Sequence, residues 1–319
     1  MLFAYAVDGN RLTQLPVAAD LAGAIWVDLY RPLPEQVERV RALGVDVPTL
    51  ADMEEIEISN RLYREDGADY LTVVLPGLSE SKVPISGPVS FILTRDRLVT
   101  VRHHAPRPFE TYPTRADKVG PGCGGPRRLF LSLVEEIIGR LADLLEGAGR
   151  SLDDLTGRIL AEGAGAADTA LQAGLRDVAR QSDLIGRVRL SLLTIERAIS
   201  FFGQALPDKP GGEELRPYVK GLMRDIQALE VHCDYLGSRL SMASDVTLGM
   251  VNLVQNKTVK ILSVVAALFL PPTLIASTYG MNFALMPELN WRWGYPMALG
   301  LMLASAAGTY IFLRWKRWL

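Results

Sequence analysis

The polar groups best placed to do chemistry lie within an otherwise apolar stretch near the C-terminus. Pro271 and Pro272 have no backbone N–H, so they leave carbonyl oxygens of the preceding turn unpaired. Thr273 and Ser277 follow one helical turn apart and add two hydroxyl groups. Such groups could line a polar pathway, whereas a simple membrane anchor has no use for them. Ordinary Ser/Thr packing between membrane helices is the alternative. The same helix face carries Leu262, Ala266 and Leu270.

No catalytic or cofactor site is predicted elsewhere. His103 and His104 are adjacent at an expected strand end, so their side chains diverge and a two-histidine metal site is not favoured. Cys123 and Cys233 have no CxxC partner and no histidine at metal-site spacing. No Ser/His/Asp set and no ATP motif is present. The sequence therefore predicts neither an enzyme nor an organic cofactor.

The distribution of charge divides the chain into two parts. The 319 residues are 49% hydrophobic and carry 34 Lys and Arg against 36 Asp and Glu. This composition excludes a disordered chain, and it lacks the basic excess of a general nucleic-acid binder. The last 59 residues hold only five formal charges, so 30 basic and 35 acidic residues, a net charge of −5, precede Ile261. The five are Glu288, Arg292, Arg314, Lys316 and Arg317.

Two segments are predicted to cross a lipid bilayer. Residues 261–279 and 295–313 are each 19 residues long and uncharged, and at ~1.5 Å per residue each can span about 30 Å of hydrocarbon. Buried core helices are the alternative, but they seldom run this long without charge. Tryptophans at 291, 293, 315 and 318 fit the membrane interfaces. Residues 280–294 then form a short external loop.

Basic residues flank both predicted spans on the same side. Lys257 and Lys260 precede the first span, and the tail 314–319 follows the second with three further positive charges. By the positive-inside rule, both flanks and both chain termini lie in the cytosol. The N-terminus lacks the basic region and apolar run of a signal peptide, so the large body is also expected to be cytosolic.

The cytosolic body is predicted to have two regions. Over residues 1–120, short β-rich runs alternate with brief helical patterns, which predicts an α/β domain with a hairpin turning at Arg95 and Asp96. A stretch dense in Gly and Pro over 118–126 marks the boundary. Residues 121–260 are expected to form long helices over 127–162 and 168–204, and then a stalk.

The stalk carries a heptad stripe and no helix breaker before the first span. Stalk and span are therefore expected to form one helix up to ~90 Å long, which could couple a cytosolic event to a membrane gate. The stripe consists of Leu222, Ile226, Leu229, Cys233, Leu236, Leu240, Ala243, Thr247, Met250 and Val254.

Two spans cannot enclose a polar pathway, so the chain is either a membrane anchor or one subunit of a ring. The external end favours the ring, because the first span runs into Tyr-Gly-Met-Asn-Phe at 279–283 and then Met-Pro-Glu-Leu at 286–289. These residues resemble the CorA family of magnesium transporters, whose signature is Gly-Met-Asn at the end of the first of two C-terminal spans, followed by an MPEL-like loop. The resemblance covers roughly 218–319 and includes QNKTVKILSVV, LFLPPTLIAS, WGYP and KRWL.

The resemblance implies a funnel-shaped homopentamer in the cell inner membrane, with the first span of each subunit lining a central pore. Five copies of Gly280, Met281 and Asn282 would ring its external mouth as a selectivity filter. Mg²⁺ gives up its water shell reluctantly, and neutral amide and carbonyl oxygens could bind the hydrated ion. The membrane potential would drive uptake, at ~2.3 kcal/mol per charge per 100 mV.

The resemblance also assigns roles along the pore and in the cytosol. Thr273 and Ser277 would offer hydroxyl groups, and Leu270 and Leu262 would form apolar constrictions that gate by dewetting, with Ala266 lining the pore between them. Asn256 would lie near the cytosolic mouth. Asp245 would form a cytosolic acidic ring. Family members sense cytosolic Mg²⁺ through acidic residues between subunits, for which Asp225, Glu54 and Glu55 are candidates. A solvated acidic face is the alternative for these three residues.

Two features of the external loop bear on the choice of ion. Many relatives carry an acid after Asn-Phe, but this chain has Ala284, so Glu288 is left as the one loop carboxylate for ion capture. Relatives that move zinc tend to replace the Met of the triplet with Ile, so Met281 favours Mg²⁺, with Co²⁺ and Ni²⁺ as further cargo. The rival hypotheses are a zinc transporter of the same superfamily and a membrane-anchored sensor.

Overall fold

The computed structural model describes residues 1–16, 18–55, 57–162, 168–209, 211–281, 286, 291–316 and 318. The chain divides into two compact units. The first consists of Met1–Leu155 and Arg176–Ala243, and the second of Thr156–Leu175 and Ser244–Leu319.

A seven-stranded mixed sheet organises the first unit. Its strand order is β2-β1-β3-β7-β6-β5-β4, and every neighbouring pair is antiparallel except β3 and β7. The expected hairpin is confirmed, because Leu93 on β6 pairs with Leu98 on β7 around the turn at Arg95 and Asp96. The strands are β1 (Leu2–Asp8), β2 (Arg11–Gln14), β3 (Trp26–Tyr30), β4 (Leu62–Glu65), β5 (Ala68–Leu78), β6 (Pro84–Leu93) and β7 (Leu98–Arg102).

Each face of the sheet is buried by a different set of helices. Side chains alternate between the faces along a strand, so Val99 and Val101 on β7 face one apolar cluster while Leu98 faces another. The cluster with Val99 includes Val40 from α1 (Pro34–Arg41) and Met53 from α2 (Leu50–Glu54). The short helix α3 (Ile58–Arg61) precedes β4, and α4 (Pro108–Thr111) follows the last strand, β7.

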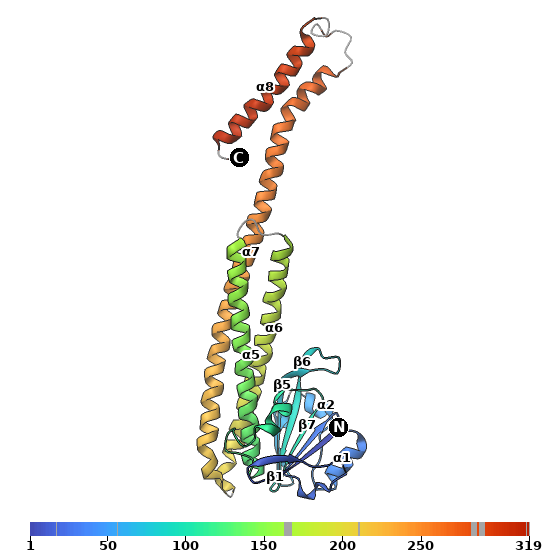
Figure 1. Cartoon of the computed structure of the whole chain (residues 1–319), viewed down its shortest axis with the longest axis vertical. Coiled ribbons are helices and arrows are strands. Elements are labelled where there is room, and N and C mark those ends of the chain that lie inside the picture. The colour runs from blue at the N-terminus through green and yellow to red at the C-terminus, as the bar shows by residue number, and fades with distance from the viewer. Residues whose placement is uncertain are drawn as a thin grey trace. The chain divides into compact units, whose positions relative to one another are not determined.

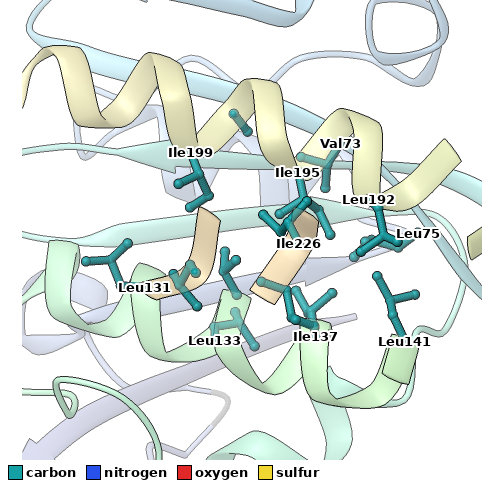
Figure 2. Packing of buried hydrophobic residues seen from close by; sticks show 14 of the residues in the cluster. Val73, Leu75, Leu131, Leu133, Ile137, Leu141, Leu192, Ile195, Ile199 and Ile226 are labelled. Atoms are coloured by element: carbon teal, nitrogen blue, oxygen red, sulfur yellow. The ribbon is translucent and has the colours of Figure 1, made fainter. Parts of the chain in front are cut away.

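The other face packs against long helices. Figure 1 shows α5 (Pro126–Glu162) and α6 (Asp168–Gln204) running alongside each other next to the sheet. In Figure 2, Ile137 of α5, Ile195 of α6 and Ile226 of α7 meet near Val73 and Leu75 of β5. These five side chains are at most 3% exposed, so sheet and helices share one core.

The stalk and the first apolar segment form one helix, as the sequence predicts. Helix α7 runs unbroken from Gly212 to Tyr279, and Gly212 is required at its start because a Cβ there would lie 1.9 Å from the Leu206 carbonyl oxygen. Six positions of the heptad stripe are fully buried: Leu222, Ile226, Cys233, Leu236, Ala243 and Thr247. Helix α8 (Gly294–Trp315) covers the second predicted span.

Candidate functional site

Among the residues that the structure describes, two helices contain stretches long and apolar enough to cross a membrane. The most apolar 18-residue window of α7 has a mean hydropathy of 2.0, and that of α8 has a mean hydropathy of 1.6. None of the α7 window and 11% of the α8 window is buried. A core helix of a soluble protein would be mostly buried, so the exposure of these windows favours lipid or further subunits as their surroundings.

The predicted pore residues share one side of α7. With roughly 100° between successive residues, they fall within about 120° of the helix circumference. All are exposed in the single chain, and Leu262 and Leu270 are each 69% exposed. The set consists of Asp245, Asn256, Leu262, Ala266, Leu270, Thr273 and Ser277.

The roughly opposite side of α7 is partly covered. Val264, Leu268, Ile275 and Tyr279 have intermediate exposure and lie within about 60° of one another. Helix α8, in the same unit, has its own stripe of covered residues spaced three or four apart: Gly294, Ala298, Met302, Ser305, Thr309 and Leu313. These stripes fit packing of α8 against this side of α7 (Figure 1), which leaves the predicted pore side uncovered.

The two prolines do not interrupt α7. Pro271 and Pro272 lie within the continuous helix, so the carbonyl oxygens of Ala267 and Leu268 receive no N–H from four residues ahead. At the next position, the Thr273 hydroxyl donates a 2.7 Å hydrogen bond to the Phe269 carbonyl oxygen. Its oxygen keeps lone pairs that can accept hydrogen bonds, so this short segment combines free acceptors with the fixed geometry of a helix.

Helix α7 ends immediately before the predicted filter. The Gly280 N–H still donates to the Ala276 carbonyl oxygen at 2.9 Å, and a Cβ at Gly280 would lie 3.2 Å from that oxygen. Gly280 is not among the glycines with positive φ, so here the glycine provides space rather than a left-handed turn. Met281 is 48% exposed. Asn282, Ala284 and Glu288 lie outside the described residues.

The three proposed sensing residues are not brought together. Asp225 lies on α7 next to Ile226, and Ile226 belongs to the apolar cluster on one face of the sheet. Glu54 belongs to α2, whose Met53 packs on the other face. Glu55 follows α2 and accepts a hydrogen bond from the Asn60 amide. Within the described part of the chain, no group of three or more His, Cys, Asp or Glu side chains is arranged to hold a metal ion.

Asp225 instead has a neighbour that the sequence pattern did not reveal. Burial of Glu135 on α5 raises the pKa of its carboxyl group, and the negative charge of Asp225 raises it further. The Glu135 carboxylate also packs against Gly120, where a Cβ would lie 2.9 Å from its Oε2. The two acids are about 90 residues apart in the chain, so only the packing of α5 against α7 brings them close.

Buried ion pairs in the first unit were also missed by sequence reasoning. Asp28 on β3 and Arg102 on β7 have side chains 3% and 5% exposed, and Arg102 Nη2 donates to Asp28 Oδ2 at 2.8 Å. Thr100 donates to Asp28 Oδ1 at 2.8 Å. Asp69 on β5 similarly pairs with Arg64 at 3.1 Å and with Lys209. A charged residue within an apolar strand, as in AIWVDLY, was the available signal.

His104, one of the two adjacent histidines, has a structural role. The His104 side chain is 2% exposed, and its Nε2–H donates to the Leu75 carbonyl oxygen at 2.9 Å. Its ring fills the space over Gly77 and Gly87, where a Cβ would come within 2.9 Å of ring atoms. Burial lowers the pKa of His104 to about 4, so the ring is neutral at physiological pH.

Comparison with known proteins connects this geometry with one family. Residues 22–317 match the family model described as CorA-like Mg²⁺ transporter protein. The chain is 33% identical to the magnesium transport proteins CorA of Haemophilus influenzae, over 323 aligned positions, and Escherichia coli, over 322, with full coverage of both chains in each case. The complete CorA structure from Methanocaldococcus jannaschii matches with a TM-score of 0.68 at 20% identity, covering 100% of this chain and 99% of that one.

Proposed function

The chain belongs to the CorA-like Mg²⁺ transporter family, and on that premise we propose that it carries Mg²⁺ across the cell inner membrane as a homopentamer. Five copies of α7 would surround one pore, with both chain termini in the cytosol. Co²⁺ and Ni²⁺ would be further cargo. The chain would act as a transporter without an organic cofactor, driven by the membrane potential.

One observation carries this proposal most strongly. The side of α7 that bears Thr273 and Ser277 is exposed in the single chain and lies away from the side that α8 can cover. The Thr273 hydroxyl donates within the helix, but its oxygen would find no donor in hydrocarbon, so this side is better suited to a water-filled pathway. A ring of identical subunits supplies such a pathway, because it turns the same side of every α7 toward one axis.

The chemistry of the proposed filter suits a hydrated ion. Mg²⁺ holds its waters in a tight octahedron, and stripping them costs more than neutral ligands repay. Gly280 has no side chain, and Asn282 would contribute an amide oxygen, so the ring could accept hydrogen bonds from the ion's waters. Glu288 would attract cations to the external mouth, and Met281 would complete the triplet.

Deeper in the pore, the proposed roles follow the order of residues along α7. Leu270, Ala266 and Leu262 would form the apolar stretch that closes by dewetting, with Thr273 and Ser277 on its external side. Asn256 and the Asp245 carboxylate would form polar and acidic rings on its cytosolic side. Weak binding at several successive rings lets an ion enter and also leave.

Feedback by cytosolic Mg²⁺ is the second part of the proposal. Asp225 is supported as a sensing residue because Glu135 lies within the range of its charge, and a divalent cation would relieve their mutual repulsion. Glu54 and Glu55 remain candidates for contacts with a neighbouring subunit. Bound Mg²⁺ would favour the closed pore, so transport would fall as cytosolic Mg²⁺ rises.

Ion flux into proteoliposomes tests the proposal. The purified chain should admit Mg²⁺ under an inside-negative potential, and Mg²⁺ loaded inside the vesicles should reduce the flux. Asn282→Ala should lower Mg²⁺ flux at least about tenfold if the amide binds the hydrated ion. Asn290→Ala, at another amide of the same loop, is the matched control. An Asn282→Ala variant with unchanged flux would show that the filter is wrongly assigned, and a preference for Zn²⁺ across pH would favour the zinc rival.

A further inference from the structure

A pocket of about 620 Å³ opens on the sheet of the first unit, apart from every residue assigned to ion transport. Its floor is formed by Phe3 and Tyr5 of β1 and by Asp28 and Arg102, and the segment from Phe109 to Lys118 forms a wall. The volume lies within the range of roughly 300–1,000 Å³ that is typical of small-molecule sites.

The buried guanidinium at the floor has unused hydrogen-bonding capacity. Arg102 is bound to Asp28 through Nε and Nη2, and Nη1 donates to the His104 carbonyl oxygen at 3.2 Å. These bonds engage three of the five N–H groups of an arginine, so two have no partner among the residues that the structure describes. The guanidinium carbon lies 4.4 Å from the centroid of the Tyr30 ring and 5.0 Å from that of Phe109, which holds it in place.

The charges around the pocket are unequally paired. Asp28 is neutralised by Arg102, and Asp117 by Arg11 at 3.3 Å. Lys118 makes no ion pair with any described residue, so its ammonium group is available to a ligand. Glu110 at the rim is the remaining carboxylate, and it could accept a hydrogen bond from a neutral donor. The lining therefore offers an anionic group the Lys118 ammonium and the remaining N–H groups of Arg102, and it offers a hydrogen-bond donor the Glu110 carboxylate.

The rest of the lining is apolar. Phe3, Leu12 and Pro113 are partly exposed, and together with the edges of Tyr5 and Phe109 they offer surface for a flat ring. Aromatic surface next to a few convergent polar groups is the usual composition of a ligand pocket. A metal ion alone would leave this apolar surface without a partner.

We propose that this pocket binds a small organic anion built on a flat ring, with its anionic group held by Arg102 and Lys118 and its ring against Phe3, Leu12 and Pro113. This proposal does not rest on the proposed transport function, because binding to the pocket can be measured without ion flux. The anionic group is a phosphate or a carboxylate, and the experiment below compares one ligand of each kind.

Calorimetric titration of the full chain in detergent micelles, in Mg²⁺-free buffer, tests the proposal. Adenosine monophosphate and indole-3-acetate each combine a flat ring, an N–H donor and an anionic group, one as phosphate and the other as carboxylate. At least one should bind with a Kd below about 1 mM. Adenosine has the ring without the anion and inorganic phosphate the anion without the ring, so each should bind at least about tenfold more weakly. Failure of both ring anions overturns the proposal. If adenosine monophosphate binds, adenosine binding equally well also overturns it.

Variants locate the binding. Lys118→Ala should weaken binding about fivefold, the size expected for one exposed charge, and Lys118 is exposed enough that the variant should fold. Lys220→Ala removes another exposed lysine, on α7, and should leave the Kd unchanged. Leu12→Trp should abolish binding by filling the pocket. Equal Kd values for the Lys118 and Lys220 variants would overturn the assignment to this pocket, whatever the Leu12 variant does.

Discussion

The two units of the chain differ in where their charges lie and how they are paired. In the first unit, buried charges such as Asp28 and Asp69 are paired with arginine or lysine from the same chain. In the second unit, residues 261–279 carry no formal charge, and no residue in the most apolar window of α7 is fully buried. The first unit thus pairs these buried charges within the chain, whereas the second has apolar surface that lipid or further copies of the chain could cover.

The largest expected effect comes from breaking a buried ion pair of the first unit. Arg102→Met should lower the free energy of unfolding by about 3–5 kcal/mol, because it leaves the buried Asp28 carboxylate without a compensating positive charge. Chemical denaturation of the full chain in micelles, followed by fluorescence of the buried Trp26, measures the loss. The control is Arg11→Met, which breaks an ion pair whose arginine is 79% exposed and should cost less than about 1 kcal/mol. Similar losses in both variants would mean that burial does not determine how much these ion pairs contribute to the free energy of unfolding.

The same comparison can be made within a single helix. Ile226 and Leu262 both belong to α7, but Ile226 is fully buried and Leu262 is 69% exposed. Ile226→Ala should cost about 2–5 kcal/mol of unfolding free energy in micelles. Leu262→Ala should cost less than about 0.5 kcal/mol and should instead raise Mg²⁺ flux measured against high internal Mg²⁺. A stability loss at Leu262 as large as that at Ile226 would count against a pore-facing position.

Acid should weaken the first unit through His104. The folded-state pKa of about 4 lies below the usual value near 6.5, so between these values the unfolded chain binds a proton that the folded chain does not. The stability contributed by the neutral ring is complete above about pH 6.5 and is lost as pH falls toward 4, by roughly 3 kcal/mol. Unfolding free energies from pH 7 to 4 should fall less steeply for His104→Gln than for the parent chain. Parallel pH profiles would rule out His104 as a source of the loss.

The smallest effect concerns the external loop. Ala284→Glu should lower the external Mg²⁺ concentration for half-maximal flux by up to about fivefold, because an added carboxylate in each subunit strengthens the attraction of cations. Ala284→Gln keeps the size of the side chain without its charge and should leave that concentration unchanged. A value unchanged or raised in the Glu variant would contradict the idea that the native loop has a weakened capture field.

Much of the fold could be predicted because periodicity and helix breakers are local signals. The helices expected over 127–162 and 168–204 are confirmed as Pro126–Glu162 and Asp168–Gln204. The continuous helix through Pro271 and Pro272 is also confirmed. Strand pairing was harder, because the parallel contact of β3 with β7 joins residues more than 70 positions apart. Local pattern contains no information about such distant partners.

The pore side of α7 could be predicted from the sequence, whereas the surroundings of the proposed sensing residue Asp225 could not. Spacing alone placed Leu262, Leu270 and Thr273 on one side of α7, since helical geometry fixes that relation. It could not bring Glu135 within range of the Asp225 charge, because that depends on how α5 packs against α7. The roles of the residues named for the pore and for sensing remain predictions for the flux measurements.

The pairing of Asp28 with Arg102 also limits the mutational paths open to this chain. Either residue could be replaced by an apolar one if the other changed at the same time, because an apolar pair of similar volume can be as stable as a buried ion pair. Each single substitution, however, passes through a chain with one uncompensated charge in its core, and a few kcal/mol is a large part of the stability of a domain. Substitutions at these two positions should therefore show strong epistasis, with each change tolerated only in the presence of the other.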